Sequence, residues 1–342
     1  MSNIKIGLIG AGRIGRLHAA NLSYRVSGAE IVAVADVFPG AAKECAQELS
    51  IPSAVEDPRR ILDDPRIDAV FICTSTDTHA SLIEQAAKAG KHIFCEKPIA
   101  LDLPTIDRAL ATVGRAGVSL QIGFNRRFDS NFRRARELVA EGKIGQPHVL
   151  RITSRDPEPP PPEYVKVSGG IFLDMMIHDF DMARYLMQDE VVEVYASGAV
   201  LVDPRIGELG DVDTAVVTLH FKSGALGVID NSRRAVYGYD QRAEVFGEKG
   251  TVVVSNPKPD TAVLSGSEGD HSSALYHFFT DRYMDAYVAE AEAFVLSIEK
   301  GESPLVSGRD GKIPVAMGYA AKLSLAENRP VRLTEIDPGL NL

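Results

Sequence analysis

A glycine-rich turn near the start of the chain constrains the fold more than any other feature of the sequence. The apolar run Ile4–Ile9 is typical of a buried strand and leads directly into Gly10-Ala11-Gly12-Arg13-Ile14-Gly15, after which a helical pattern continues to about Leu22. In a strand-turn-helix unit, the first glycine permits the turn, the second lets backbone N–H groups approach a pyrophosphate, and the third allows close helix packing. The phosphates would lie at the positive end of the helix. The pattern therefore predicts a dinucleotide site.

An acidic residue follows this turn at the spacing of a ribose-binding carboxylate. A second apolar strand, residues 30–35, ends in Asp36. A carboxylate at this position accepts hydrogen bonds from both hydroxyls of the adenosine ribose and repels a 2′-phosphate. Val37 and Phe38 come next, and no arginine adjoins them. We therefore expect NAD to be preferred over NADP, with the strictness of the preference left open.

Strand and helix patterns then alternate up to about residue 124. Repeated units of this kind build a doubly wound parallel sheet, whose ligands bind at the carboxyl ends of the strands. We expect an NAD-binding Rossmann domain over residues 1–124. Its predicted helices are 40–49, 78–89 and 104–115, and its predicted strands are 69–73, 92–95 and 118–122.

Two short segments after the strands of this sheet are expected to face the cofactor. In the first, Thr74 and Ser75 would line the nicotinamide ribose, while His79 either joins them or only begins a helix. The second is Glu96-Lys97-Pro98, in which Lys97 lies between a buried strand and a proline. A stiff turn would hold its ammonium group at the active edge of the sheet, so we favour a functional lysine over a solvated one.

A third such segment contains the adjacent residues Arg126 and Arg127. Either side chain would suit a polar substrate or the cofactor, and we expect one of the two to be an ordinary surface charge.

From residue 125 the pattern changes, and residues 125–342 are expected to form a substrate-binding and oligomerisation domain. After a predicted helix at 131–141 and strand at 148–153, five of the six residues 157–162 are proline. They predict a stiff extended loop that walls the pocket or meets another subunit.

Long alternating segments later in the chain predict a large, mostly antiparallel open sheet covered by helices on one face, which gives an α/β plus α+β protein overall. The other face is a candidate for subunit contact. A helix at 281–298 is expected to close the chain and pack back on the first domain. The predicted strands are 191–200, 213–221, 225–231, 241–247 and 250–254.

The stretch from Gly169-Gly170 to Met182 reads as one largely buried helix that carries unusually many ionisable groups. Asp174, His178 and Asp181 follow each other at spacings of four and three, so they would share one face. That face would line something polar. The alternative is a core helix whose histidine and aspartates satisfy each other.

Composition excludes several classes of partner. The chain has 37 Lys and Arg against 47 Asp and Glu, a net charge of −10, which disfavours nucleic acid. Cys45, Cys73 and Cys95 have no metal-type spacing, so we expect no metal site and a reducing, cytoplasmic compartment. No apolar run approaches the roughly 20 residues that cross a membrane.

Together, the Gly10–Gly15 turn, Glu96-Lys97-Pro98, and Gly169-Gly170 followed by Asp174, His178 and Asp181 resemble the glucose-fructose oxidoreductase/inositol dehydrogenase (Gfo/Idh/MocA) family over nearly the whole chain. Residues 154–157, the proline run and residues 168–184 are most similar to members that oxidise myo-inositol at C2. The resemblance implies NAD as cofactor, no metal and a homotetramer built on the open sheet.

The resemblance also implies roles for individual residues. Lys97, Asp174 and His178 would form the catalytic set: His178 takes the hydroxyl proton and Lys97 stabilises the developing alkoxide. Asp174 would orient the histidine ring or bind a neighbouring hydroxyl, and Asp181 would act indirectly. Arg127 and Tyr237 would contact the polyol, with Tyr239 competing for the second place. The expected cofactor-binding residues are Gly10, Gly12, Arg13, Ile14, Gly15, Asp36, Thr74, Ser75, His79, Glu96 and Lys97.

The activity implied is the oxidation of myo-inositol to its 2-keto product. Relatives that act on scyllo-inositol, other isomers or pyranose sugars keep the same residues, so the substrate and the direction in the cell stay open. An NAD-dependent glycosidase is a more distant alternative. A dinucleotide-binding regulatory protein could dispense with Lys97 or His178, and this chain has both.

Overall fold

The structure, a computed structural model, describes residues 3–340. These residues form two compact units. The first contains the described residues up to Phe128 together with Asp285–Val315, and the second contains Asp129–Met284 together with the described residues from Ala316. The chain therefore enters each unit twice.

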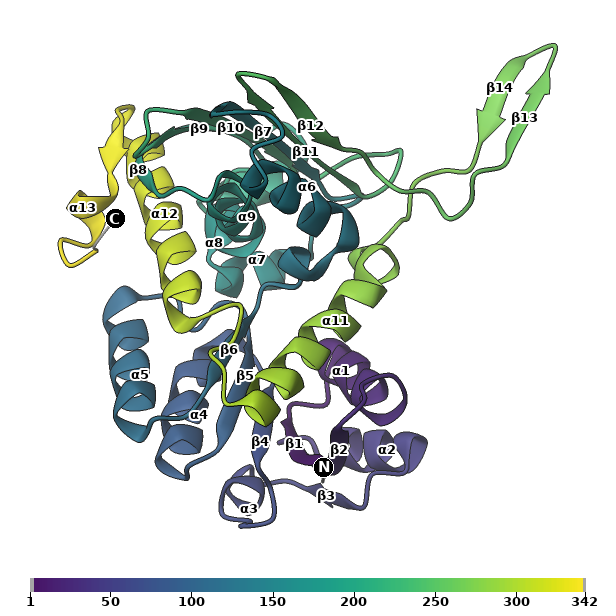
Figure 1. Cartoon of the computed structure of the whole chain (residues 1–342), viewed down its shortest axis with the longest axis vertical. Helices are drawn as coiled ribbons and strands as arrows, with labels where there is room; N and C mark the ends of the chain where they lie inside the picture. Colours follow the sequence, from purple (N-terminus) through teal and green to yellow (C-terminus); the bar gives the residue numbers. More distant parts are fainter. Residues whose placement is uncertain (1–2, 341–342) are drawn as a thin grey trace. The chain divides into compact units, whose positions relative to one another are not determined.

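The first unit is built on a six-stranded sheet in the order β3-β2-β1-β4-β5-β6, with every neighbouring pair parallel (Figure 1). This is the strand order of a Rossmann fold, which confirms the fold predicted for this part of the chain. All residues of β4 are buried, as expected for a strand covered on both faces. The strands are β1 (Ile4–Ile9), β2 (Ala29–Ala35), β3 (Ser53–Val55), β4 (Ala69–Ile72), β5 (His92–Glu96) and β6 (Leu120–Gly123), and the helices are α1 (Arg13–Tyr24), α2 (Pro39–Leu49), α3 (Arg59–Leu62), α4 (Thr76–Lys88), α5 (Leu103–Ala116) and the 3₁₀ turn Asn125–Phe128.

Helix α11 (Phe279–Lys300) adds to the core of this unit. It has a kink at Tyr283, and its apolar side chains from Val288 onwards pack with those of β1 and β4. Phe294 meets the ring of Phe71 edge-on, with the centroids 5.5 Å apart. The sheet therefore gains a covering helix that lies far away in sequence.

Helix α12 (Gly308–Glu327) was not predicted, and the expectation that the preceding helix closes the chain is wrong. Its sequence contains Gly308, Gly311 and Pro314, residues that are typical of turns. The structure gives a reason for one glycine: a Cβ at position 311 would lie 2.7 Å from Ile99 Cδ1, so only glycine lets the helix approach this closely.

The second unit is built on a seven-stranded sheet in the order β12-β11-β7-β10-β9-β8-β15. Only β10 and β7 pair in parallel, so the predicted, mostly antiparallel sheet is confirmed. Helix α9 packs on β7, and α6 packs on α9 (Figure 1). The strands are β7 (Pro147–Arg155), β8 (Val191–Ala199), β9 (Thr214–Phe221), β10 (Leu226–Ser232), β11 (Asp240–Gly247), β12 (Gly250–Val254) and β15 (Val331–Arg332), and the helices are α6 (Ser130–Ala140), α7 (Pro162–Ser168), α8 (Gly170–Asp174), α9 (Ile177–Met187), α10 (Pro204–Glu208) and α13 (Leu333–Ile336).

A separate hairpin of β13 (Val263–Gly266) and β14 (Gly269–Ser272) projects away from the seven-stranded sheet (Figure 1). All residues of both strands are exposed. Because the hairpin has no buried face, its sequence lacks the alternation that marks a half-buried strand, and it was not predicted.

The predicted central helix is in fact two helices, α8 and α9. They are separated by Met175 and Met176, and the backbone N–H of Met176 donates to Ile171 O at 2.8 Å, one residue beyond the normal helical spacing. A periodic pattern could not reveal this break, because apolar side chains continue through it. The proline run is confirmed as a loop up to residue 161, and α7 begins at Pro162, where proline suits the first helical turn. In the part of the chain that the structure describes, no helix combines the length and the apolar character that crossing a bilayer requires.

Candidate active site

The glycine turn of the first unit has the geometry that a dinucleotide needs. Gly10 has φ +101°, and a Cβ there would lie 2.6 Å from Cys73 O; a Cβ at Gly15 would lie 1.8 Å from Gly10 O. A Cβ at Gly12 would meet nothing within 4 Å. The first and third glycines are therefore required by the protein's own packing, while the second leaves open space at the N-terminus of α1. A pyrophosphate fits this cradle.

Replacement of Gly15 by alanine tests the turn. The added methyl group collides with the backbone of Gly10, so we expect a destabilisation of about 1–3 kcal/mol and a weakening of NAD binding by at least roughly tenfold as the cradle shifts. Isothermal titration calorimetry with NAD measures the affinity. Gly114→Ala, at a helical site where a Cβ meets nothing within 4 Å, is the matched control. NAD affinity in Gly15→Ala equal to that of the control would contradict this account of the turn.

Asp36 lies at the end of β2 in a fixed orientation. Its Oδ2 accepts from the backbone N–H of Ala11 at 2.7 Å, and its Oδ1 accepts from that of Phe38 at 2.9 Å. The carboxylate is therefore anchored to the glycine turn and keeps further lone pairs for ribose hydroxyls. Val37 and Phe38 are 74% and 72% exposed, which places an apolar surface beside the acid.

The turn after β4 is tied to the turn that follows Lys97. His79 is 2% exposed, and its ring nitrogens lie 2.8 Å from Pro98 O and 3.0 Å from Thr74 O. Thr74 Oγ1 also lies 2.6 Å from Thr78 Oγ1, and Ser75 is exposed at the start of α4. His79 therefore connects the segment after β4 with the segment after β5, at the carboxyl edge of the sheet.

Lys97 directly follows β5 and is half-buried, with a cis peptide bond to Pro98. The neighbouring arginines are less exposed than the sequence suggested. Arg126 is 5% exposed, and Arg127 pairs with Asp310 at 3.0 Å with its side chain 11% exposed. The expectation that one of the two is a surface charge is wrong, because the segment after β6 folds into a buried 3₁₀ turn.

Asp174 in the second unit is held by two residues that the sequence did not single out. Its Oδ1 accepts from the hydroxyl of Tyr164 at 2.9 Å, and its Oδ2 accepts from Arg233 NH1 at 3.0 Å. Arg233 is 3% exposed and also lies 3.7 Å from Asp156. Burial alone would lower the pKa of Arg233, but the carboxylates of Asp174 and Asp156 outweigh it and raise that pKa. A buried cation therefore fixes the carboxylate of Asp174.

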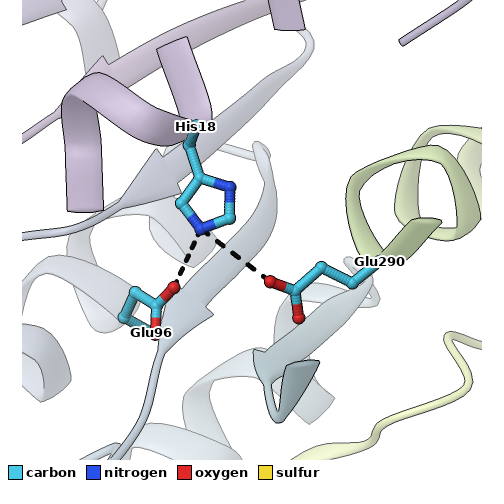
Figure 2. A group of neighbouring side chains, drawn as sticks. All are labelled: His18, Glu96 and Glu290. Atoms are coloured by element: carbon cyan, nitrogen blue, oxygen red, sulfur yellow. Dashed lines mark hydrogen bonds and ion pairs between the residues drawn. The ribbon is translucent and has the colours of Figure 1, made fainter. Parts of the chain in front are cut away.

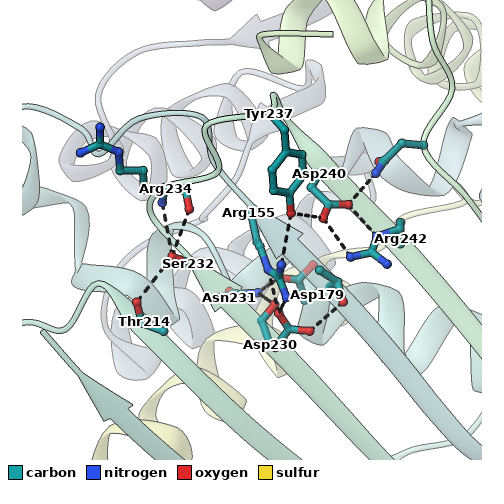
Figure 3. Close-up of polar contacts among 12 residues, drawn as sticks. Arg155, Asp179, Thr214, Asp230, Asn231, Ser232, Arg234, Tyr237, Asp240 and Arg242 are labelled. Atoms are coloured by element: carbon teal, nitrogen blue, oxygen red, sulfur yellow. Dashed lines mark hydrogen bonds and ion pairs between the residues drawn. The ribbon is translucent and has the colours of Figure 1, made fainter. Parts of the chain in front are cut away.

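His178 lies in the first turn of α9 and is half-buried, and the residue after it anchors the helix. Asp179 is fully buried, and its Oδ1 lies 2.5 Å from Ser154 Oγ. Its Oδ2 lies 2.9 Å from Asn231 Nδ2 (Figure 3). These partners come from β7 and β10. Asp181 is also fully buried. Asp174 and His178 are thus half-buried and Asp181 is fully buried, and the break between α8 and α9 separates Asp174 from the other two.

The two candidate tyrosines also differ in exposure. Tyr237 is 48% exposed, and its hydroxyl lies 2.7 Å from Asp240 Oδ2 and 3.2 Å from Arg155 NH1 (Figure 3). Burial and the neighbouring carboxylate of Asp240 raise the pKa of Tyr237, so the phenol stays neutral. Tyr239 is 7% exposed and packs edge-on against Tyr283. Of the two, Tyr237 is therefore the more accessible.

Lys97 belongs to the first unit, and Asp174 and His178 belong to the second. Tyr164, Arg233 and Asp179 could not be selected from the sequence alone. Arg233 and the exposed Arg234 look alike in the sequence, and only the folded chain separates them.

Comparisons with known proteins match both parts of the chain. Residues 4–124 match the model of an oxidoreductase family with an NAD-binding Rossmann fold, and residues 132–253 match the GFO/IDH/MocA C-terminal domain. A relative from Thermotoga maritima named myo-inositol 2-dehydrogenase is 55% identical over 97% of this chain and 99% of its own.

Solved structures agree with this similarity. A myo-inositol dehydrogenase from Corynebacterium glutamicum superposes with a TM-score of 0.92 at 38% identity, over 97% of this chain and 99% of its own. A scyllo-inositol dehydrogenase from Lactobacillus casei with bound NAD(H) and scyllo-inositol has a TM-score of 0.91 at 31% identity, over 97% and 100% of the two chains.

Proposed function

The chain belongs to the GFO/IDH/MocA family, and we propose that this NAD-dependent oxidoreductase, which acts on CH–OH groups, oxidises myo-inositol to its 2-keto product. The observation that carries the proposal is the fixed carboxylate of Asp174, held by Tyr164 and Arg233 four residues before His178. A polyol presents several hydroxyl groups, and a carboxylate with an invariant orientation accepts hydrogen bonds from them selectively. The similarity to a relative named myo-inositol 2-dehydrogenase supports the choice of substrate.

The chain's own residues divide the work of oxidation. NAD, when bound, supplies the acceptor for the hydride. His178, whose side chain ordinarily titrates near neutral pH, removes the hydroxyl proton. The ammonium group of Lys97 donates to the reacting oxygen and stabilises its developing negative charge. Asp174 accepts from a neighbouring hydroxyl, and Arg127 and Tyr237 make further contacts to the polyol. Gly10, Gly12, Arg13, Ile14, Gly15 and Asp36, with Thr74, Ser75, His79 and Glu96, hold or support the cofactor.

The second candidate is oxidation of scyllo-inositol. The solved relative with bound NAD(H) and scyllo-inositol favours it. The two isomers differ only in the configuration at one carbon, so Asp174, His178 and Lys97 would serve both. Values of kcat/KM for myo-inositol, scyllo-inositol, D-chiro-inositol and glucose separate the candidates. The proposal requires the highest value for myo-inositol, and a higher value for scyllo-inositol would replace the substrate while keeping the mechanism.

Asp36→Ala tests the ribose site. The variant loses both the acceptor for the ribose hydroxyls and the repulsion of a 2′-phosphate, so we expect the ratio of kcat/KM for NAD over NADP to fall by roughly 10–100-fold. Steady-state rates with each cofactor measure the ratio. Asp57→Ala, which removes a carboxylate that belongs neither to the glycine turn nor to the segment around Asp36, is the control. An unchanged ratio in Asp36→Ala would mean that another residue reads the ribose.

The proposal extends to assembly and compartment: a cytoplasmic homotetramer that uses the open face of the seven-stranded sheet. Val216, Leu226, Phe246 and Val253 share this face by strand register and are 46–56% exposed. Apolar groups of this kind on an open sheet favour contact with another subunit.

Phe246→Asp tests the assembly. A charge buried in a subunit contact is costly, so we expect a tetrameric mass for the unmodified protein and a smaller species for the variant in size-exclusion chromatography with light scattering. Leu201→Asp, at an exposed leucine outside the strands, should keep the tetrameric mass. A monomeric unmodified protein would contradict the assembly.

A further inference from the structure

Three ionisable side chains lie together inside the first unit. Only one of them, Glu96, has a role in the proposed function. His18 comes from α1, Glu96 from the end of β5 and Glu290 from α11 (Figure 2). His18 and Glu290 are fully buried, and the side chain of Glu96 is 15% exposed. Histidine and glutamate are rarely buried this completely without a specific role.

A short hydrogen bond joins two members of the group. His18 Nε2 donates to Glu96 Oε1 at 2.8 Å, while Glu290 Oε1 lies 3.9 Å from the same nitrogen, beyond hydrogen-bond distance. The other oxygen of Glu96 lies against Gly123, where a Cβ would come within 3.0 Å of it. The carboxylate of Glu96 is therefore hydrogen-bonded through one oxygen, and the other lies where only a glycine at position 123 leaves room for it.

Glu290 is the unexplained member. Neither of its carboxyl oxygens has a hydrogen-bond partner among residues 3–340. It approaches the ring of His18, which is packed against Phe71, Phe94 and Tyr287 with centroids 5.0–5.6 Å away. Burial, and then the negative charge of Glu96, raises the pKa of Glu290 well above its ordinary value. Burial without a hydrogen-bond donor, next to a second carboxylate, therefore favours the protonated, uncharged form of this group.

The position of the group in the chain gives it a consequence for catalysis. Helix α1, which carries His18, begins at the glycine turn, and Glu96 is the residue before Lys97. The His18–Glu96 hydrogen bond therefore connects the helix at the cofactor phosphates to the turn that carries Lys97.

We propose that His18 is a positioning residue for Lys97, which it fixes through Glu96, and that Glu290 completes the group as an uncharged acid. The link to Lys97 rests on the proposed function, whereas the state of Glu290 does not. His18 and Glu290 touch neither substrate nor cofactor in this scheme.

A pair of variants tests the link. His18→Leu removes the donor to Glu96, and we expect kcat to fall by roughly 10–100-fold, the effect of a small misplacement of a reacting group, with KM for NAD changed by less than about threefold. His18→Gln offers an amide N–H at a similar reach, so it should recover most of kcat. His148→Leu, at an exposed histidine, is the control. A normal kcat in His18→Leu, or a kcat in His18→Gln as low as in His18→Leu, would overturn the positioning role.

Glu290→Gln tests the third member without relying on activity. In the unfolded chain, Glu290 ionises above its ordinary pKa, whereas in the folded chain it keeps its proton. The unmodified protein therefore loses stability as pH rises from the ordinary pKa towards the raised one, and glutamine does not titrate. We expect the unfolding constant of the unmodified protein, relative to that of the variant, to rise by up to about tenfold per pH unit in this window. The titratable groups that interact with Glu290, namely His18, Glu96 and Cys73, are the same in both proteins.

Urea unfolding at about pH 5 and about pH 8 measures this ratio, with Glu292→Gln, at an exposed residue of the same helix, as the control. A ratio that does not change with pH would overturn the neutral state of Glu290. The three side chains also offer ligand atoms within 4.8 Å of one another, so a stoichiometric divalent cation in the purified protein that is lost in Glu290→Gln would overturn it as well. If the protein oxidises no polyol but the ratio rises as expected, the proposed function fails and the state of Glu290 stands.

Discussion

Alanine at Lys97 or at His178 is expected to lower kcat for polyol oxidation by roughly a hundred- to ten-thousandfold while NAD binds with nearly unchanged affinity. Without His178 no side chain takes the hydroxyl proton, a loss that costs about 10²–10⁴ in rate. Without Lys97 the developing alkoxide loses its cationic donor, which costs about 10²–10³. Neither residue belongs to the glycine turn or to the segment around Asp36, so the dissociation constant for NAD should stay within about threefold.

Two exposed residues provide matched controls: Lys88→Ala in the first unit and His271→Ala in the second. Both should retain normal kcat. Progress curves of NADH absorbance give the rates, and titration calorimetry gives the affinity for NAD. The division of labour would be refuted by a folded His178→Ala protein that fails to bind NAD, and the assigned roles would be refuted by normal turnover in either variant.

Arg233→Met is expected to destabilise the protein by about 3–5 kcal/mol, the usual effect of removing one partner from a buried ion pair. The guanidinium is 3% exposed and pairs with Asp174 at 3.0 Å and Asp156 at 3.7 Å. Its loss would leave two carboxylates without their shared cation. Turnover should fall as well, because Asp174 would lose the guanidinium that helps to orient its carboxylate.

Urea unfolding compares this variant with Arg234→Met, which changes the adjacent but exposed arginine. The control should unfold within about 0.5 kcal/mol of the unmodified protein, as surface substitutions usually do. Arg233→Lys is a second comparison, since lysine supplies the charge without the planar fork of donors, and it should recover only part of the stability. Equal stability of Arg233→Met and Arg234→Met would show that the pair does not hold Asp174 in place.

Local sequence patterns predicted the parts of the fold that depend on local chemistry. Gly10, Gly12 and Gly15 lie in one short segment between a strand and a helix, so their spacing was enough to predict the Rossmann sheet and its glycine cradle. The alternation of β9 predicted a strand with one buried face, and the exposed face is seen. Helix α12 was missed because its glycines serve close packing against distant residues such as Ile99, which no local pattern encodes.

The candidate site, too, could be predicted only where its residues lie in local motifs. Lys97, Asp174 and His178 could be named because they lie in short motifs, and their roles stay predictions. The residues that hold these side chains in place could not be predicted. Arg233 reaches Asp174 across 59 positions of the chain, and Glu290 joins His18 and Glu96 from a helix near the other end. Such contacts depend on the register of strands and the docking of helices, which the sequence does not display.

The initial rate of NADH formation by the purified protein, with NAD and myo-inositol at mildly alkaline pH, tests polyol oxidation itself, with Lys97→Ala for comparison. We expect a rate that rises with the concentrations of protein and polyol, falls at least about a hundredfold in Lys97→Ala and is much lower with NADP. Binding of NAD without any NADH formation from myo-inositol or the other polyols would contradict this expectation and would favour a dinucleotide-binding regulator or a glycosidase that retains its cofactor.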